Sequence, residues 1–131
     1  MRQRCAHEKA EQEACLKWWD DCGCRLMGCR DKRLLFHIPN GGYRRLSTGI
    51  AMKKAGLRPG VPDLFLAIPA GGKNGLFIEM KRLYGGVLSQ SQKEMISLLE
   101  GQGYACAVCH GWIEARNAIA AYLSVDIPSF K

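Results

Sequence analysis

Two short apolar runs separated by turn residues constrain the fold of this chain more than any other feature. Residues 63–68 and 75–81 are rich in strand-forming residues, and the segment 69–74 between them contains Pro, Gly and Asn. These runs are therefore predicted to form a β-hairpin. Side chains alternate faces along a strand, so Glu79 and Lys81 should share one face while Ile78 and Met80 point into the core.

The polar residues of this hairpin favour phosphodiester chemistry. Asp63 opens the first run and can place a second carboxylate beside Glu79 and Lys81. Charged groups are costly to bury without a purpose. Two carboxylates and a lysine suit a Mg²⁺ ion and a water molecule that attacks a phosphodiester.

The remaining segments predict an α/β fold in a single domain over residues 1–131. Helices are expected over 7–20, 47–55, 89–101 and 112–123, and further strands over 34–38 and 104–109. Residues 20–33 are expected to form an irregular basic loop, and 124–131 a tail. This order predicts a mixed central sheet of about four strands flanked by helices.

Helix-capping signals support two of these helices. Ser47 or Thr48 is expected to cap the helix that Gly56 ends. Ser89 and Gln92 have the spacing of a capping box, in which the glutamine folds back onto the helix start.

Charge and hydropathy limit the classes of partner that we expect for this chain. The chain has 19 Lys and Arg against 12 Asp and Glu, a net charge of +7, which favours a nucleic acid. It contains no apolar run long enough to span a membrane and no signal-peptide segment, so we expect an intracellular protein without a membrane partner.

The seven cysteines are expected to be free thiols. Cys22, Cys24 and Cys29 form one candidate cluster for metal binding or redox chemistry. Cys106 and Cys109, with His110, form another, but residues three apart on a strand face opposite sides, which disfavours a shared zinc ion. A histidine on a strand face, not a ligand, is expected at position 37.

Several motifs follow one another in a familiar order. Pro39-Asn40-Gly41-Gly42-Tyr43-Arg44 precedes the segment 54–64 with its Pro62-Asp63, then come Glu79-Met80-Lys81 and the segment 85–89 with Gln92. This succession resembles the VRR-NUC family of the PD-(D/E)xK nucleases, in the small stand-alone form found in phages and bacteria. The resemblance covers about residues 5–123 and implies a restriction-endonuclease-like fold that binds Mg²⁺ or Mn²⁺.

The resemblance also implies roles for individual residues. Asp63, Glu79 and the backbone carbonyl of Met80 would bind the metal ion, and Glu8 on the first helix would reach it directly or through water. Glu11 is the alternative to Glu8. Lys81 would position the attacking water and stabilise charge on the phosphate, and Gln92 would orient the nucleophile or Lys81.

DNA is the expected partner. The residues expected to contact it are Asn40, Gly41, Gly42, Arg44, Arg45, Lys53, Lys54, Arg58, Arg82 and Ser89. The resemblance implies a homodimer that cuts branched DNA such as Holliday junctions and has no small-molecule substrate. The alternatives are a non-catalytic nucleic-acid-binding module on the same fold, a flap-directed nuclease or RNase, and a cysteine-based zinc protein.

Overall fold

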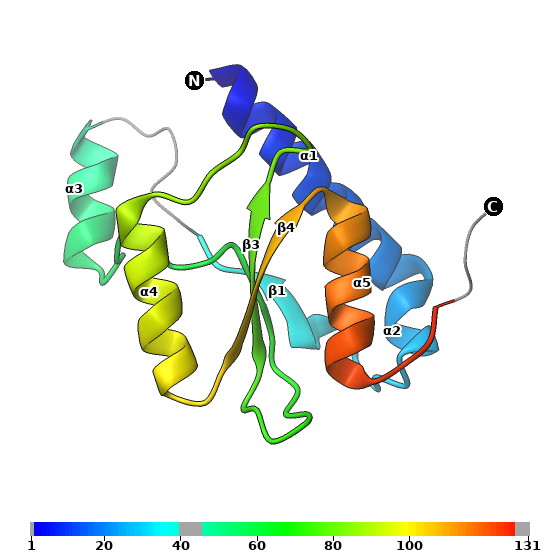
Figure 1. Ribbon diagram of the computed structural model, residues 1–131. Helices are drawn as coiled ribbons and strands as arrows, with labels where there is room; N and C mark the ends of the chain where they lie inside the picture. Colours follow the sequence, from blue (N-terminus) through cyan, green and yellow to red (C-terminus); the bar gives the residue numbers. More distant parts are fainter. Residues whose placement is uncertain (1, 40–45, 128–131) are drawn as a thin grey trace.

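A four-stranded mixed sheet forms the framework of the computed structural model, which describes residues 2–39 and 46–127 (Figure 1). The strands lie in the order β1 (Leu35–His37), β2 (Leu64–Leu66), β3 (Leu76–Lys81) and β4 (Ala105–His110). β1 pairs antiparallel with β2, and β2 with β3, whereas β3 and β4 are parallel. The predicted hairpin and the predicted α/β class, a mixed sheet flanked by helices, are confirmed.

Helices flank both faces of this sheet. α1 (Arg2–Trp18), α2 (Cys24–Leu26) and α5 (Trp112–Leu123) lie on one side, and α4 (Gln90–Gly101) lies on the other (Figure 1). α3 (Leu46–Lys54) lies on the α4 side, away from the sheet (Figure 1). Among the described residues, no helix combines the length and the apolarity needed to cross a bilayer.

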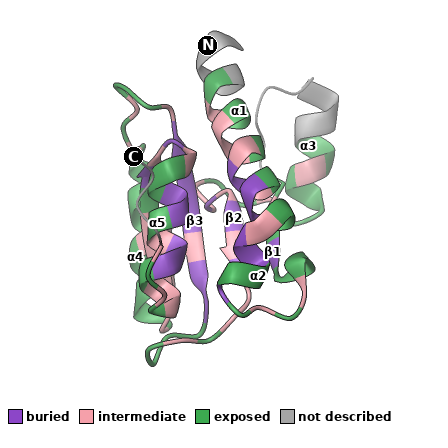
Figure 2. Cartoon of the chain, turned by 90° about the vertical axis from the view of Figure 1, so that its right-hand side faces the viewer, coloured by how far each residue is buried: buried purple, intermediate pink, exposed green. Residues whose placement is uncertain are grey.

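The core fills the space between the sheet and the α1–α5 side. Its fully buried members include Trp19, Leu64, Ile78, Met80 and Ile119. Figure 2 shows buried residues concentrated along β3 and on the inner side of α5. Ile78 and Met80 thus point into the core as predicted, and Glu79 and Lys81 are left on the α4 side of the sheet.

A row of aromatic rings spans the opposite face of the strands. Phe36, Phe65 and Phe77 are aligned by the strand register, with ring centroids 5.8 and 4.4 Å apart. Tyr104 packs edge-on against Phe65 and Phe77. Gly75 permits this packing, because a Cβ there would lie 2.6 Å from the Phe65 ring. The row ties β1, β2 and β3 together across the sheet.

The hairpin turn follows its predicted chemistry. Ala70 and Lys73 exchange backbone hydrogen bonds of 3.1 and 2.9 Å. Gly71 and Gly72 between them have φ values of +57° and +80°, which only glycine adopts without cost. A two-residue turn with two positive φ values matches the right-handed twist of the strands and fixes their register.

Residues 20–26 are helical, so the prediction of an irregular loop over 20–33 is wrong in its first half. α1 continues through a π-helical turn, η1 (Trp19–Gly23), into α2. Gly23 continues the helix and packs on Trp18, where a Cβ would lie 2.8 Å from the ring. A short 3₁₀ turn, η2 (Lys32–Leu34), follows, and its Lys32 carbonyl accepts a hydrogen bond from Trp19 Nε1 at 2.9 Å.

Two smaller predictions also differ from the structure. α3 begins at Leu46, so Ser47 and Thr48 lie inside the helix and the predicted cap is wrong. Its predicted end is confirmed, because Gly56, two residues after Lys54, has φ +107°. The expected tail packs partly on the core through Val125 and Ile127.

Candidate active site

Asp63 and Glu79 meet where β2 begins. Leu64 pairs with Ile78, so extending the register by one residue places Asp63 opposite Glu79. The Asp63 side chain turns toward β3, where Oδ2 accepts a hydrogen bond from the Met80 N–H at 2.8 Å. The Asp63 carboxylate thus accepts the hydrogen bond of a β3 backbone N–H at the point where the pairing of β2 with β3 ends.

Gln92 joins the two charged residues of β3 to α4. Its Oε1 accepts hydrogen bonds from Lys81 Nζ and from the Ser89 backbone N–H, both at 2.9 Å. Its Nε2 donates to Glu79 Oε1 at 2.9 Å, and Lys81 Nζ lies 3.8 Å from that same oxygen. The predicted capping box is confirmed, because Gln92 N–H also donates to Ser89 Oγ at 3.2 Å. One side chain therefore caps α4 and holds the site.

The site buries charge that the protein only partly neutralises. Glu79 is 4% exposed and Lys81 7% exposed. Burial, reinforced by the negative charge of Asp63, raises the pKa of Glu79 to about 8. Burial also raises the pKa of Asp63, against the lowering effect of the hydrogen bond from the Met80 N–H. Within the part of the chain that the structure describes, Glu79 Oε2 is buried without a hydrogen-bond partner.

The structure separates the two candidate glutamates of α1. Glu11 Oε2 accepts a hydrogen bond from the Trp112 backbone N–H at 2.7 Å, which caps the first turn of α5. Glu8 lies one turn away from Gln12, and its negative charge contributes to the raised pKa of Glu79. Glu11 thus serves the packing of α1 against α5, whereas Glu8 lies near enough to Glu79 to add to its raised pKa.

His37 lies between α1 and the backbone of Asp63, a link that was not predicted from the sequence. Its Nδ1 lies 3.0 Å from the Asp63 carbonyl oxygen and 3.1 Å from Gln12 Nε2. The position on a strand face was predicted, but the contact was not. The available signal was a histidine at the end of a strand expected to run beside Asp63.

The donor set suits a hard cation. Two carboxylates lie at one strand end, and one of their oxygens is buried without a partner. Among the described residues, no three His, Cys, Asp or Glu side chains are grouped closely enough to hold a metal ion by themselves. Any ion here would depend on the carboxylate pair together with backbone or solvent oxygens.

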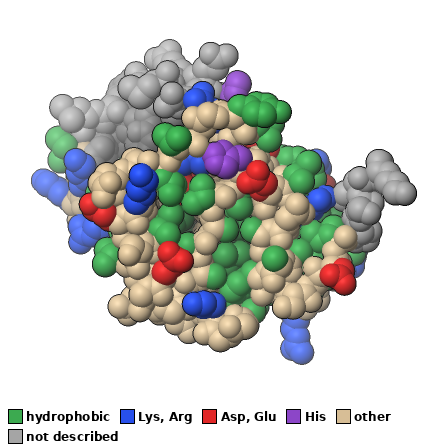
Figure 3. All heavy atoms as spheres, viewed as in Figure 1, with side chains coloured by type: hydrophobic (Ala, Val, Ile, Leu, Met, Phe, Trp, Pro, Cys, Tyr) green, Lys and Arg blue, Asp and Glu red, His purple; other side chains and the backbone are tan. Residues whose placement is uncertain are grey.

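The residues expected to contact DNA are spread around this site. Lys53, Lys54 and Arg58 are exposed on α3 and the segment after it, Arg82 directly follows β3, and Ser89 caps α4. Figure 3 shows Lys and Arg side chains gathered on the side of the molecule that carries α3 and α4. Asn40, Gly41, Gly42, Arg44 and Arg45 lie outside the described residues.

Six cysteines whose side chains are described are free thiols, as predicted. Cys106 and Cys109 lie on opposite faces of β4, also as predicted. Cys106 Sγ is 4.0 Å from the Ile96 carbonyl oxygen of α4, whereas Cys109 is buried in the core near Cys15. Burial raises the pKa of Cys15 and of Cys109 to about 12, so both thiols stay protonated at neutral pH.

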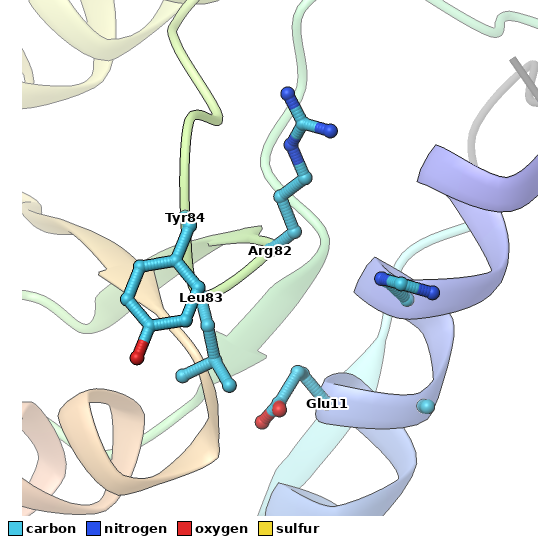
Figure 4. A pocket seen from close by; sticks show the side chains of 6 residues that line it. Glu11, Arg82, Leu83 and Tyr84 are labelled. Atoms are coloured by element: carbon cyan, nitrogen blue, oxygen red, sulfur yellow. The ribbon is translucent and has the colours of Figure 1, made fainter.

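A cavity of about 420 Å³ lies between α1 and the segment after β3 (Figure 4). His7, Ala10, Glu11, Arg82, Leu83 and Tyr84 line it. This pocket was not predicted from the sequence, although the adjoining Leu83 and Tyr84 lie outside any predicted strand. Its lining combines α1 with the segment that follows Lys81, so it is a product of tertiary packing.

Comparison with known proteins supports the fold and the family. The model of the VRR-NUC domain matches residues 6–112, which is most of the chain. A solved structure described as a VRR_NUC domain protein has a TM-score of 0.73 at 24% identity, covering 91% of this chain and 89% of that chain. No match was found among the curated proteins.

The sheet, its flanking helices and the acidic strand end define a nuclease-like α/β protein. The chain belongs to the VRR-NUC domain family, a family of nuclease type, which confirms the predicted resemblance. A nuclease domain of this family implies DNA as the partner.

Proposed function

We propose that this protein is a metal-dependent endonuclease that hydrolyses phosphodiester bonds in branched DNA. The observation that carries the proposal is the cluster at the end of β3. Glu79 and Lys81 are buried, Gln92 bridges them, and the Asp63 carboxylate is fixed against the Met80 N–H. A structural ion pair would not need a second carboxylate beside the first, since like charges raise the cost of burial.

Mg²⁺ or Mn²⁺ fits the oxygen donors at this position. Asp63 and Glu79 would hold the ion, and the orphan Glu79 Oε2 would gain the partner that it lacks. The N–H and C=O of one strand residue point to the same side. Because the Met80 N–H points to Asp63, the Met80 carbonyl is also directed to this side and can serve as a further ligand. Glu8 would contribute from α1, directly or through water.

Each polar side chain then has a distinct task. The metal ion, when bound, would polarise the scissile phosphate and lower the pKa of a coordinated water molecule. Lys81 would donate to the phosphate oxygens as negative charge develops on them. Gln92 fixes Lys81 through Oε1 and Glu79 through Nε2, so it acts as a positioning residue for both.

Branched DNA and a homodimer extend the proposal to the substrate. The net charge of +7 and the basic side of Figure 3 favour a polyanion of considerable length. A domain of this size has little surface with which to recognise a branch alone. Two copies related by a two-fold axis would place two sites on the two arms of a four-way junction.

Two other functions compete with this one. A non-catalytic DNA-binding module on the same fold would explain the charge but not the buried Glu79 and Lys81 beside Asp63. A flap-directed nuclease would use the same site on a different branch. Metal dependence separates the first alternative from the proposal, and a panel of substrates separates the second.

The decisive experiment compares cleavage of labelled four-way junction, flap and linear duplex DNA. Wild type, Asp63→Ala and the control Asp20→Ala would be assayed with Mg²⁺, Mn²⁺ or EDTA at fixed salt. Asp20 is an exposed carboxylate on the π-helical turn, outside the proposed site. We expect metal-dependent cutting of the junction by wild type and by Asp20→Ala, and none by Asp63→Ala.

Each contrary result has a clear meaning. Binding without cleavage under every metal condition would refute the nuclease proposal and favour the DNA-binding module. Equal cutting of junction and linear duplex at matched salt would refute the selectivity for branches. Preferential cutting of the flap would favour the flap-directed alternative.

A further inference from the structure

The pocket between α1 and the segment after β3 has a floor held by three tertiary contacts. Glu11 Oε2 is fixed by the Trp112 N–H at 2.7 Å. Leu83 packs on Gly111, where a Cβ would lie only 2.5 Å from Leu83 Cδ2. His110 Nδ1–H donates to the Arg82 carbonyl oxygen at 3.0 Å. The pocket is therefore held in shape by α1, β4 and α5 together and needs little ordering to accept a ligand.

One wall of the pocket is an aromatic side chain that the fold does not bury. Tyr84 is 85% exposed, in contrast to the core residues of the neighbouring β3. Figure 4 shows Glu11 pointing into the space that Leu83 and Tyr84 border from the other side, with Arg82 extending away along the upper edge. A large exposed ring beside a concave surface is a typical site for stacking.

The pocket's charged groups add polar contacts to this apolar surface. Glu11 lines the pocket, and among the described residues Arg82 Nε is buried without a hydrogen-bond partner. The Arg82 guanidinium is tethered by a hydrogen bond of 3.2 Å to the Gly85 carbonyl oxygen. A carboxylate oxygen can accept from the amino group of a base, and an arginine can contact a phosphate.

The pocket adjoins the proposed catalytic groups along the chain and in space. Arg82 directly follows Lys81, and Glu11 is three residues from Glu8 on the same helix. The intervening loop is held against Lys81, because Gly86 packs where a Cβ would lie 3.1 Å from Lys81 Cβ. A strand whose phosphate lies at Lys81 would therefore lie near the loop that borders the pocket.

We propose that this pocket binds one unpaired nucleobase of the DNA, next to the scissile phosphate, with Tyr84 stacked on the base. The inference rests on the proposed function and makes its selectivity for branches specific. A branch point is where bases lose their partners and can leave the stack at low cost. A cavity of about 420 Å³ is large enough for a base and its sugar.

A binding cycle tests the pocket without using catalysis. The protein would carry Asp63→Ala, in EDTA, and fluorescence anisotropy would measure its affinity for branched DNA. Each DNA would have one abasic residue at a different position on either side of the branch point. With Tyr84 intact, we expect affinity to fall about tenfold at one position, the order expected for the loss of one base–aromatic stack.

Variants of the loop complete the cycle. Tyr84→Ala should bind intact DNA about tenfold more weakly and should lose no further affinity when that base is removed. Tyr84→Phe should behave as the parent, because the ring is retained. Val87→Ala is the matched control, since Val87 is 79% exposed in the same loop but does not line the pocket. We expect it to keep the parent affinity.

The outcomes distinguish this inference from the proposed function. The pocket would be overturned if no abasic position lowered the binding affinity. It would also be overturned if the losses of affinity from Tyr84→Ala and from base removal were independent, so that the double change lost the product of the two factors. If wild type cleaves the junction but Tyr84→Ala and base removal affect binding independently, the base-binding pocket is refuted and the nuclease proposal stands. A coupled cycle without cleavage under any metal condition would refute the nuclease proposal and leave the base-binding pocket in place.

Discussion

Replacing Glu79 with glutamine should stabilise the metal-free protein, and the gain should grow with pH. The change keeps the side-chain shape and the carbonyl oxygen that accepts from Gln92 Nε2. It removes a group whose pKa burial raises from 4.5 to about 8. Because the folded state holds the Glu79 proton more tightly than the unfolded chain, ionisation favours unfolding. The buried carboxylate thus opposes stability in the absence of a cation.

The magnitude follows from the shift in pKa. Each unit is about 1.4 kcal/mol, so the full cost of ionising Glu79 approaches about 5 kcal/mol at most. The cost is nearly absent below pH 4.5, increases between pH 4.5 and about 8, and is complete above that. Near pH 7 it is about 3 kcal/mol by the same relation. Against a total stability of about 5–15 kcal/mol, such a difference is readily measured.

Urea unfolding in EDTA at several pH values would measure this effect. We expect wild type and Glu79→Gln to have similar free energies of unfolding near pH 4.5 and to diverge steadily up to pH 9. Glu13→Gln is the matched control, because Glu13 is an exposed glutamate of α1 and should leave the pH profile unchanged. Added Mg²⁺ should stabilise wild type far more than Glu79→Gln. Parallel pH profiles for wild type and Glu79→Gln would refute the reasoning.

Four further substitutions test how the site is supported, each by unfolding measurements. Gly60→Ala should lower the free energy of unfolding by clearly more than Gly56→Ala. Both glycines have positive φ, but only a Cβ at position 60 would lie 2.2 Å from the backbone of α4. Equal losses of stability in the two variants would contradict this. Ser89→Ala should cost about 1 kcal/mol as a lost cap. Gln92→Ala should cost about 2–4 kcal/mol and reduce cleavage, because it also leaves buried polar groups without a partner. Glu11→Ala should lower stability by about 1 kcal/mol but leave stabilisation by Mg²⁺ unchanged; loss of the Mg²⁺ effect would return Glu11 to the metal site.

Much of the fold could be predicted because it depends on neighbours along the chain. The glycines at 71 and 72 specify the hairpin turn through their backbone freedom, and the apolar runs beside it specify the strands. The capping box of Ser89 and Gln92 likewise involves residues three apart. By contrast, the extension of α1 through Gly23 depends on a ring that packs where a Cβ would lie, and no helix propensity encodes that contact.

The site divides in the same way. The sequence by itself determined that Asp63, Glu79 and Lys81 would meet, because strand alternation and a tight hairpin leave them few other positions. Only the tertiary structure decided that Glu11, and not Glu8, caps α5, since both residues have the same chemistry on one helix. The hydrogen bonds from Gln92 to β3 and the pocket beside Tyr84 also arise only from the tertiary structure. Local backbone geometry is determined by adjacent residues, whereas the direction of a side chain between elements is determined by packing across the whole fold.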